Sequence, residues 1–217
     1  MQPEQLTHEL IALLPTLPSG QRYMLGITGG PAAGKSTLAT ALAASVNHHM
    51  GQEVAAIVPM DGFHLTNAAL DALALRSLKG IPSTFDAAGF VRLLTRLRRV
   101  PADRVTAPAF DRTHDEPTAD AIAILPQHRL VLVEGNYLLL PTPPWHLVRP
   151  LLDAVWYLDV TPDETHARLV ERHIAGGRSA EAARQKVMST DLPNAHLVAQ
   201  SRWRADRRVR GWAKKPS

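Results

Sequence analysis

Residues 29–36, "GGPAAGKS", constrain the fold of this chain more than any other feature of the sequence. They match G-x-x-x-x-G-K-[ST] at every fixed position, and they lie between an apolar run, "YMLGIT", and a helical pattern that begins at Lys35. In this context the glycines let successive backbone N–H groups point into one concavity, and the helix N-terminus adds its partial positive charge. The motif therefore predicts a strand, a phosphate-binding loop and a helix in succession.

The loop predicts a nucleoside triphosphate as the ligand. Lys35 can reach the β and γ phosphates, and the Ser36 hydroxyl can ligate Mg²⁺. No N-K-x-D motif, which reads guanine in GTPases, and no L-S-G-G-Q signature of transport ATPases occurs, which favours a small-molecule kinase at this length. The residues expected to hold the nucleotide are Gly29, Gly30, Pro31, Ala32, Ala33, Gly34, Lys35, Ser36 and Thr37.

Strand-like apolar runs alternate with helical patterns along most of the chain, which indicates an α/β fold with a mainly parallel sheet. Strands are expected over residues 23–28, 53–60, 129–135 and 154–160. Helices are expected over residues 3–14, 35–51, 68–78, 87–99, 163–174 and 179–188. Residues 100–127 contain four prolines and little periodicity, which predicts loops with one short strand near 107–111.

The composition is that of an ordinary globular protein. A chain of 217 residues with 45% hydrophobic and 20% charged residues is long enough for one domain with a sizeable core. The absence of cysteine excludes disulfides and thiolate metal sites. The N-terminus carries a glutamate where a signal peptide would be basic, and no long apolar run follows, so a cytoplasmic protein without a membrane span is expected.

The formal net charge of +4 is concentrated at the C-terminus. From Arg202 onward there are seven basic residues and one acid, which leaves 17 basic and 19 acidic residues in the preceding chain. We interpret residues 202–217 as a basic and solvated tail, as short terminal charge runs usually are. Binding of a nucleic acid or another acidic partner is the alternative, but it depends on the tail alone and is not favoured.

Two carboxylates, Asp61 and Glu134, follow predicted strands at the edge of the sheet where the phosphate-binding loop lies. Ligands of open parallel sheets bind at this edge. Phosphoryl transfer needs Mg²⁺ to neutralise the β and γ oxygens, and it needs a carboxylate to accept a proton from the attacking hydroxyl. The two acids could divide these roles, although either could instead cap a helix or pair with an arginine.

Five segments together resemble, in order and spacing, the superfamily of uridine kinase, pantothenate kinase and phosphoribulokinase: "GITGGPAAGKST", "PMDGFH", "KGIPSTFD", "LVLVEGNYLLL" and "RLVERH". The resemblance covers about residues 23–198 and is strongest to a bacterial branch of nucleoside/nucleotide kinase-like proteins, some labelled fructose transport system kinases. It implies a P-loop NTPase three-layer sandwich that forms a single domain over residues 1–217. A helical lid at about residues 164–190 and the cofactors ATP and Mg²⁺ are implied as well.

The resemblance also implies roles on the acceptor side. Asp61 stands where uridine kinases carry their proposed general base, and His64 replaces a tyrosine of those enzymes. Asp86 matches a contact to a substrate hydroxyl, with Phe85 packed beside it. His114 resembles a histidine that touches the nucleobase, but the tyrosine and the arginine expected around it are absent. These departures count against uridine itself as the acceptor.

Further roles are implied at the metal and the lid. Glu134 matches a glutamate near Mg²⁺, where it would act with Ser36, and Asp191 is expected to cap the helix that follows it. Arg168 and Arg172 resemble lid arginines that clamp the transferring phosphate, although an ordinary solvated helix face is the alternative. A cation that arrives on lid closure stabilises charge on the equatorial oxygens and helps exclude water.

The sequence thus favours an ATP-dependent kinase that phosphorylates a hydroxyl of a small metabolite, such as a nucleoside, a pantothenate-like alcohol or a sugar. Lys35, Arg168 and Arg172 would stabilise the transferred group, and Asp61 would orient the acceptor. A dephospho-coenzyme A kinase-like enzyme and an ATP-hydrolysing regulatory or binding module are the alternatives. The resemblance also leaves a homodimer as an expected assembly.

Overall fold

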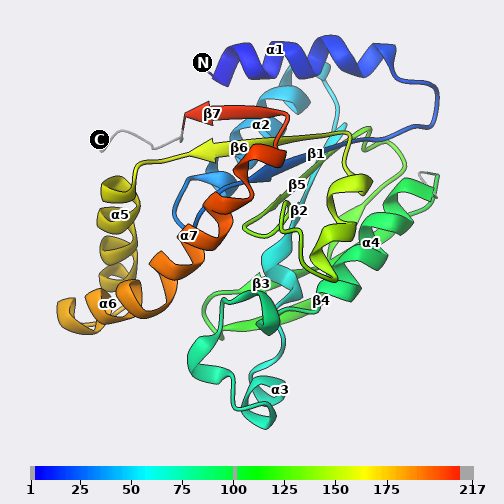
Figure 1. The fold of residues 1–217 in the computed structure, drawn as a ribbon. Helices are drawn as coiled ribbons and strands as arrows, with labels where there is room; N and C mark the ends of the chain where they lie inside the picture. Colours follow the sequence, from blue (N-terminus) through cyan, green and yellow to red (C-terminus); the bar gives the residue numbers. More distant parts are fainter. Residues whose placement is uncertain (1–2, 100–101, 211–217) are drawn as a thin grey trace.

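The structure, a computed structural model, describes residues 3–99 and 102–210. Its centre is a five-stranded sheet of β1 (Tyr23–Thr28), β2 (Ala55–Pro59), β5 (Leu130–Gly135), β6 (Ala154–Asp159) and β7 (Arg207–Arg210). The strands pair in parallel in the order β2-β5-β1-β6-β7 (Figure 1). The predicted α/β fold with a parallel central sheet is therefore confirmed.

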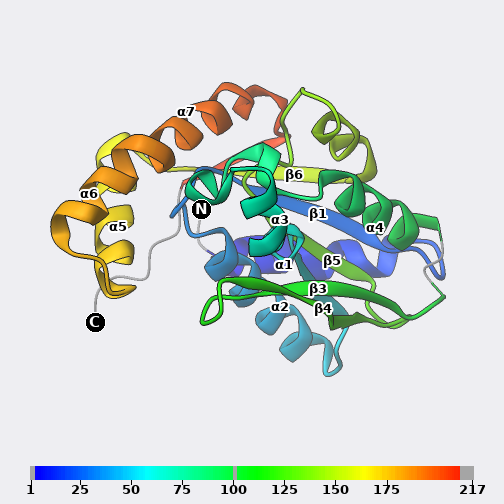
Figure 2. The same cartoon turned by 90° about the horizontal axis from the view of Figure 1, so that it is seen from below.

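Helices cover both faces of this sheet, which gives the molecule three layers (Figure 2). On one face lie α1 (Pro3–Leu13) and α2 (Lys35–Met50), and on the other α4 (Ala87–Arg99) and α7 (Leu192–Gln200). The remaining helices are α3 (Asn67–Ala72), α5 (Pro162–Ala175) and α6 (Ala180–Lys186). Among the described helices, none combines the length and the apolar composition needed to cross a bilayer.

The core lies on both sides of the sheet because successive strand residues point to opposite faces. In β1, Leu25 and Ile27 pack in a cluster with the buried leucines of α1 and α2, whereas Met24 packs in a second cluster with α4. In β6, Trp156 belongs to the first cluster and Val155 to the second. Strands that are buried on both faces consist of continuous apolar residues, which is why they were recognisable in the sequence.

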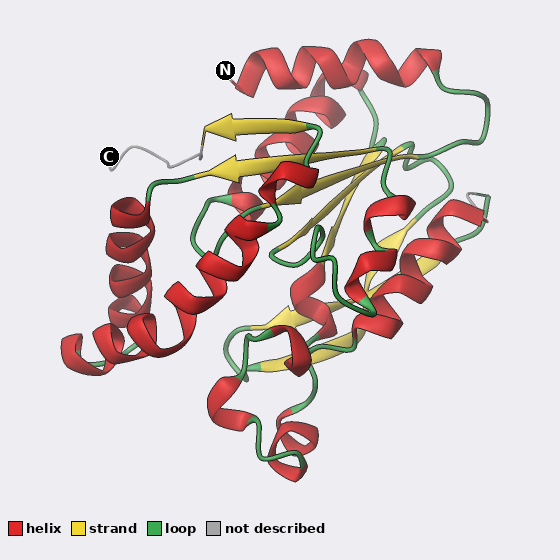
Figure 3. Cartoon of the chain, in the orientation of Figure 1, coloured by secondary structure: helices red, strands yellow, loops and turns green. Residues whose placement is uncertain are grey.

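A second, antiparallel sheet is formed by β3 (Val105–Asp111) and β4 (Glu116–Ile124), below the central sheet in Figure 3. The short strand predicted near 107–111 is confirmed, but the prediction of loops for the rest of this region is wrong; residues 100 and 101 lie outside the described residues. The hairpin tolerates its prolines because Pro108 lies at a shift in register and a two-stranded sheet has free edges.

The helix predicted over residues 68–78 is much shorter in the structure. Helix α3 ends at Ala72, and Ala74 has a left-handed φ of 55° that stops helical pairing. The Leu75 N–H donates back to the Leu70 carbonyl at 2.8 Å, and residues Arg76–Leu78 then form a separate 3₁₀ turn. The backbone therefore turns early, and the following segment becomes part of a cavity wall described below.

The prediction of a solvated tail is wrong for residues 207–210, which form strand β7 and extend the sheet beside β6. The guanidinium of Arg207 lies over the Trp156 ring, with 5.4 Å between Cζ and the ring centroid. Just before the strand, the Asp206 carboxylate accepts from the Val155 N–H at 2.6 Å and from Arg149 at 2.8 Å. Residues 211–217 of the predicted tail lie outside the described residues.

Helices α5 and α6 project from the sheet as a pair, at the left of Figure 1. They confirm the helices predicted over residues 163–174 and 179–188 to within about two residues. A π-helical turn, Val187–Asp191, joins α6 to α7 without a break. Because the chain stays helical there, Asp191 does not cap α7 as predicted, and its carboxylate instead lies 2.7 Å from His173 Nε2 on α5.

Replacing Gly62 by alanine is expected to lower the free energy of unfolding by about 1–3 kcal/mol. The added Cβ would lie 2.2 Å from the Pro108 carbonyl oxygen of β3, so the hairpin must move away from the 3₁₀ turn Met60–Phe63. Urea denaturation measures the loss. The matched control is Gly176→Ala, where the nearest atom lies at 3.4 Å; equal stability of the two variants would contradict the close packing of the hairpin on this turn.

Candidate active site

Three segments meet at the carboxyl edge of the central sheet. Ile27 of β1 and Pro59 of β2 are both register partners of Glu134 in β5, so these strands end at the same level. The phosphate-binding loop follows β1, and the turn that carries Asp61 follows β2. The sheet therefore brings the loop and the two carboxylates together, as their places after predicted strands indicated.

The phosphate-binding loop has the curled backbone that its sequence predicts. Ala32 and Gly34 both have left-handed φ angles, 57° and 92°, and α2 begins directly afterwards. The Lys35 ammonium donates to the Gly30 carbonyl at 2.9 Å, and the side chain is 8% exposed. Burial lowers the pKa of Lys35, partly offset by the charge of Glu134. The loop therefore places a desolvated cation at the N-terminus of α2, and a helix N-terminus favours an anion.

Ser36 and Glu134 form the part of the site that could hold a metal ion. The Ser36 hydroxyl donates to Glu134 Oε1 at 3.0 Å. Burial raises the pKa of Glu134, and the charge of Lys35 opposes this shift. No group of three or more His, Cys, Asp or Glu side chains among the described residues forms a metal cage. This donor set fits Mg²⁺, which is usually bound by one or two protein oxygens together with substrate phosphates.

A cavity of about 1130 Å³ opens in front of the loop and the two carboxylates. Of the predicted acceptor residues, Asp61, His64 and Phe85 line it, together with Arg172 from α5. Residues from the hairpin, the segment after α3, the loop after β5, the segment before α6 and helices α6 and α7 complete its walls. These further side chains include Arg76, Lys79, Phe110, Arg112, Asp115, Asn136, Arg178, Lys186 and Asn194.

Asp61 and His64 form one polar unit in the cavity. Arg112, from the tip of the hairpin, donates to Asp61 Oδ2 at 3.2 Å. His64 Nδ1 lies 2.7 Å from the Asp61 carbonyl, which can only accept, so Nδ1 carries the proton. Burial lowers the pKa of His64 and favours the neutral ring, whose Nε2 is then a hydrogen-bond acceptor. The unit thus offers a carboxylate and a ring nitrogen that can both accept from hydroxyl groups.

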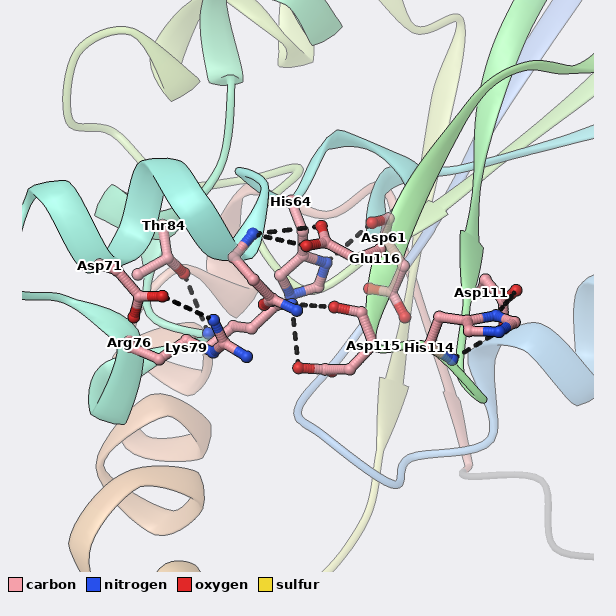
Figure 4. A network of polar contacts seen from close by, with 12 residues as sticks. Asp61, His64, Asp71, Arg76, Lys79, Thr84, Asp111, His114, Asp115 and Glu116 are labelled. Atoms are coloured by element: carbon pink, nitrogen blue, oxygen red, sulfur yellow. Dashed lines mark hydrogen bonds and ion pairs between the residues drawn. The ribbon is translucent and has the colours of Figure 1, made fainter.

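The wall beyond Asp61 combines a network of polar contacts, drawn in Figure 4, with aromatic side chains. The Lys79 ammonium donates to Asn67 at 2.7 Å and to the Asp115 carboxylate at 3.0 Å, and it lies 5.0 Å from the centroid of Phe110. The His64 ring lies against Phe85 and Phe110 in tilted contacts, with centroid distances of 3.9 and 4.6 Å. This side of the cavity therefore combines an aromatic surface with cations.

Two residues that the resemblance placed at the acceptor do not line the cavity. Asp86 Oδ1 accepts from the Gly89 N–H at 2.7 Å, so this carboxylate caps the start of α4. His114 lies at the hairpin turn with a side chain 77% exposed, and its Nδ1 contacts Asp111 at 2.7 Å. In Figure 4 no dashed line joins this pair to the contacts around Lys79. In this structure local hydrogen bonds use both side chains.

The two arginines of the predicted lid occupy different places. Arg172 lines the cavity, whereas Arg168 lies 3.5 Å from the Ala32 carbonyl and 3.7 Å from Glu164. Asn194 of α7 also lines the cavity, and its amide donates to the Gly80 carbonyl at 3.2 Å. Helix α5 thus contacts the phosphate-binding loop through Arg168. Helix α7 contacts, through Asn194, the cavity wall beyond Asp61, which is called the acceptor wall below.

A second cavity of about 690 Å³ lies on the other side of the phosphate-binding loop. Gly30 and Ala33 contribute to both its wall and the loop. The rest of the wall comes from residues 157–165, from α7 and from β7, whose Arg208 and Arg210 line it. The loop therefore stands between two hollows.

Sequence reasoning missed the residues that close the acceptor wall. The sequence motifs predict no role for Arg112, Arg76 or Lys79, although Arg112 lies two residues before His114 and Lys79 begins the segment "KGIPSTFD". Their places depend on the hairpin and on the early end of α3, neither of which the sequence pattern predicted. A glycine in "MDGFH", which the hairpin needs for its close approach, was the one local signal.

The fold and the site define a P-loop nucleotide-binding protein, and comparisons with known proteins narrow this class. No model of a known family matches the chain. A candidate uridine kinase of Schizosaccharomyces pombe is 37% identical over 187 residues, which are 83% of this chain and 80% of that protein. A solved structure of a candidate fructose transport system kinase from Silicibacter sp. TM1040 has a TM-score of 0.85 and 36% identity, and covers 96% of this chain and 99% of that one.

The structure of YFH7 from Saccharomyces cerevisiae, a candidate P-loop kinase, shares the fold with a TM-score of 0.84 at 19% identity, over 98% of this chain and 100% of that one. The chain belongs to the P-loop kinases of the uridine kinase and phosphoribulokinase superfamily. The resemblance drawn from the sequence motifs is thereby confirmed.

Proposed function

We propose that the protein transfers the γ-phosphoryl group of ATP to a hydroxyl group of a small metabolite. The observation that carries this proposal is that the phosphate-binding loop, Asp61 and the helix α5 line a single cavity. Such a cavity can hold a triphosphate at one end and an acceptor at the other, with a carboxylate between them. Positioning and charge stabilisation of this kind make up most of the catalysis of phosphoryl transfer.

In this proposal each group at the nucleotide end has one task. The loop amides and Lys35 hold the phosphates, while Ser36 and Glu134 would hold Mg²⁺, whose charge neutralises the β and γ oxygens. Arg172 faces the same space from α5 and stabilises charge on the transferred group. We place the base of ATP in the second cavity, because Gly30 and Ala33 connect it directly to the loop.

At the acceptor end, Asp61 orients the attacking hydroxyl and accepts its proton. His64 Nε2 and the aromatic surface of Phe85 position the rest of the acceptor. Arg112 donates to Asp61 in the structure. We propose that it releases Asp61 when the acceptor binds and then contacts the acceptor itself. Asp86 and His114 remain proposed acceptor contacts only if the hairpin and the start of α4 move, since both side chains have local partners.

Measurement of ADP and of phosphorylated product together tests this function. The protein is incubated with ATP and Mg²⁺ and with hydroxylated metabolites added one at a time. We expect ADP to form in proportion to a phosphorylated acceptor and to depend on which acceptor is present. Formation of ADP and free phosphate at the same rate with every acceptor would contradict the proposal and would instead support an ATP-hydrolysing regulatory module.

A further inference from the structure

The cavity is more positively charged than the rest of the molecule. Seven basic and four acidic side chains among the described residues line it. Outside the cavity, the chain before Arg202 has only 10 basic residues against 15 acidic ones. The basic residues that line the cavity are Lys35, Arg76, Lys79, Arg112, Arg172, Arg178 and Lys186, and the acidic ones are Asp61, Asp115, Glu134 and Asp191.

The nucleotide accounts for only part of this charge. Lys35 is in the phosphate-binding loop, and Arg172 lies on the helix beside it. The other cations lie along the acceptor wall, where two have carboxylate partners inside the cavity: Lys79 with Asp115 at 3.0 Å and Arg112 with Asp61 at 3.2 Å. These pairs leave Arg76, Arg178 and Lys186 as described cations of the cavity that no carboxylate in the cavity neutralises.

Lys186 is the decisive residue. It is half-buried at the end of α6, and its ammonium donates to the Ser77 carbonyl at 3.2 Å. No carboxylate of the described residues lies within 4 Å of it. Burial lowers its pKa, with a smaller opposing effect from Asp191. A partly desolvated cation without a counterion is costly, and an anionic ligand would remove that cost.

Arg76 stands on the same wall. Ser77, to which Lys186 donates, is its neighbour in the turn Arg76–Leu78. The partner of Arg76 is Asp71 at 3.1 Å, a contact drawn in Figure 4. Asp71 is exposed and does not line the cavity. Such an exposed pair contributes little and can be exchanged. Two cations from different parts of the chain, α6 and the turn after α3, therefore line the same cavity, and the hydrogen bond from Lys186 to Ser77 joins their two segments.

We propose that the phosphate acceptor carries an anionic group, a phosphate ester or a carboxylate. Lys186 and Arg76 bind this group, while Asp61 orients the hydroxyl group of the acceptor and accepts its proton. The assignment rests on the proposed kinase function and narrows its substrate to anionic alcohols. Binding of the anion also holds α6 against the turn Arg76–Leu78, because one ligand contacts both.

Matched acceptors that differ in charge test the assignment. The pairs are glycerol and glycerol phosphate, fructose and fructose monophosphate, and pantothenol and pantothenate. We expect kcat/KM to be about 10- to 100-fold higher for the charged member of the pair that is phosphorylated, the scale of a hydrogen bond to a charged group. The ester and carboxylate pairs distinguish the two kinds of anion. A preference for neutral members overturns the assignment and leaves the kinase function intact.

Variants of Lys186 then locate the anion. Lys186→Gln is expected to raise KM for the charged acceptor about 10-fold or more, with kcat and KM for ATP nearly unchanged, and Lys186→Arg should restore most of the affinity. The control is Arg184→Gln, an exposed position of the same helix that does not line the cavity. The assignment is contradicted if Lys186→Gln raises KM for ATP alone, or if it leaves KM for the charged acceptor unchanged. If no acceptor of any pair is phosphorylated, the proposed function fails, and the assignment fails with it.

Discussion

Replacing Asp61 by asparagine is expected to lower kcat by about two to four orders of magnitude, the usual contribution of a general base. The amide keeps the shape of the carboxylate but cannot accept the proton of the attacking hydroxyl. ATP·Mg²⁺ should still bind, because Lys35, Ser36 and Glu134 hold the nucleotide end without Asp61 in the proposed arrangement. Single-turnover measurement of phosphoryl transfer, together with nucleotide titration, separates the two effects.

The fold should tolerate this change. The ion pair of Asp61 with Arg112 joins side chains that are 32% and 60% exposed, and pairs this exposed contribute at most about 1 kcal/mol. The matched control is Asp86→Asn, the same chemical change at the residue that caps α4. Asparagine caps a helix about as well as aspartate. This variant should therefore keep kcat within about twofold of the parent and leave the free energy of unfolding nearly unchanged. Equal losses in both variants would show that the acceptor contacts Asp86 as well, and full activity of Asp61→Asn would contradict the proposed base.

Replacing Lys35 by methionine is expected to reduce kcat/KM by about three orders of magnitude, the loss seen when a preorganised charge on the transition state is removed. The Lys35 ammonium is buried and lies on the loop itself, so neighbouring cations cannot take its place. The thermal stabilisation by ATP·Mg²⁺, about 2.7 kcal/mol at 100 times the dissociation constant, should be lost with it. Coupled ADP assays and thermal unfolding with and without nucleotide measure both effects.

Without ligand, the same variant should be at least as stable as the parent protein. Burial of the ammonium has a desolvation cost, which is the reason for its lowered pKa, and methionine fills a similar volume without that cost. The unfolding temperature of the ligand-free variant is therefore the control. A variant that loses both activity and stability would indicate that Lys35 maintains the fold of the loop. Activity within about tenfold of the parent protein would contradict the proposed catalytic role of Lys35.

Much of the fold follows from local patterns in the sequence. The strands of the central sheet are continuous apolar runs because both of their faces are buried, and the helices α2 and α4 begin or end at residues that the pattern marks. The phosphate-binding loop is local as well, since its hydrogen bonds and its φ angles involve residues within a few positions of one another. Such features can be predicted because no distant residue is needed to define them.

Three of the errors arise because contacts with another element, which the local pattern does not encode, fix the structure of the segment. Strand β4 contains Pro117, and its large apolar residues are confined to Ile122 and Ile124 at one end, so its pairing with β3 is what makes the whole segment a strand. Strand β7 is basic and exists as an extension of the sheet beside β6. Asp191 was expected to cap a helix, but the helix continues through it and His173 from α5 takes up the carboxylate. In each case a tertiary contact outweighs the local preference.

The sequence by itself determined the class of the protein, the nucleotide loop and the two carboxylates at the strand ends, because each depends on a short motif with one backbone solution. The acceptor wall was decided by the tertiary structure alone. Arg112 reaches Asp61 across 51 residues of sequence, and Lys186 reaches the Ser77 carbonyl across 109. No local pattern encodes such contacts, since they arise only when the hairpin and the helices α5 and α6 take their places around the sheet.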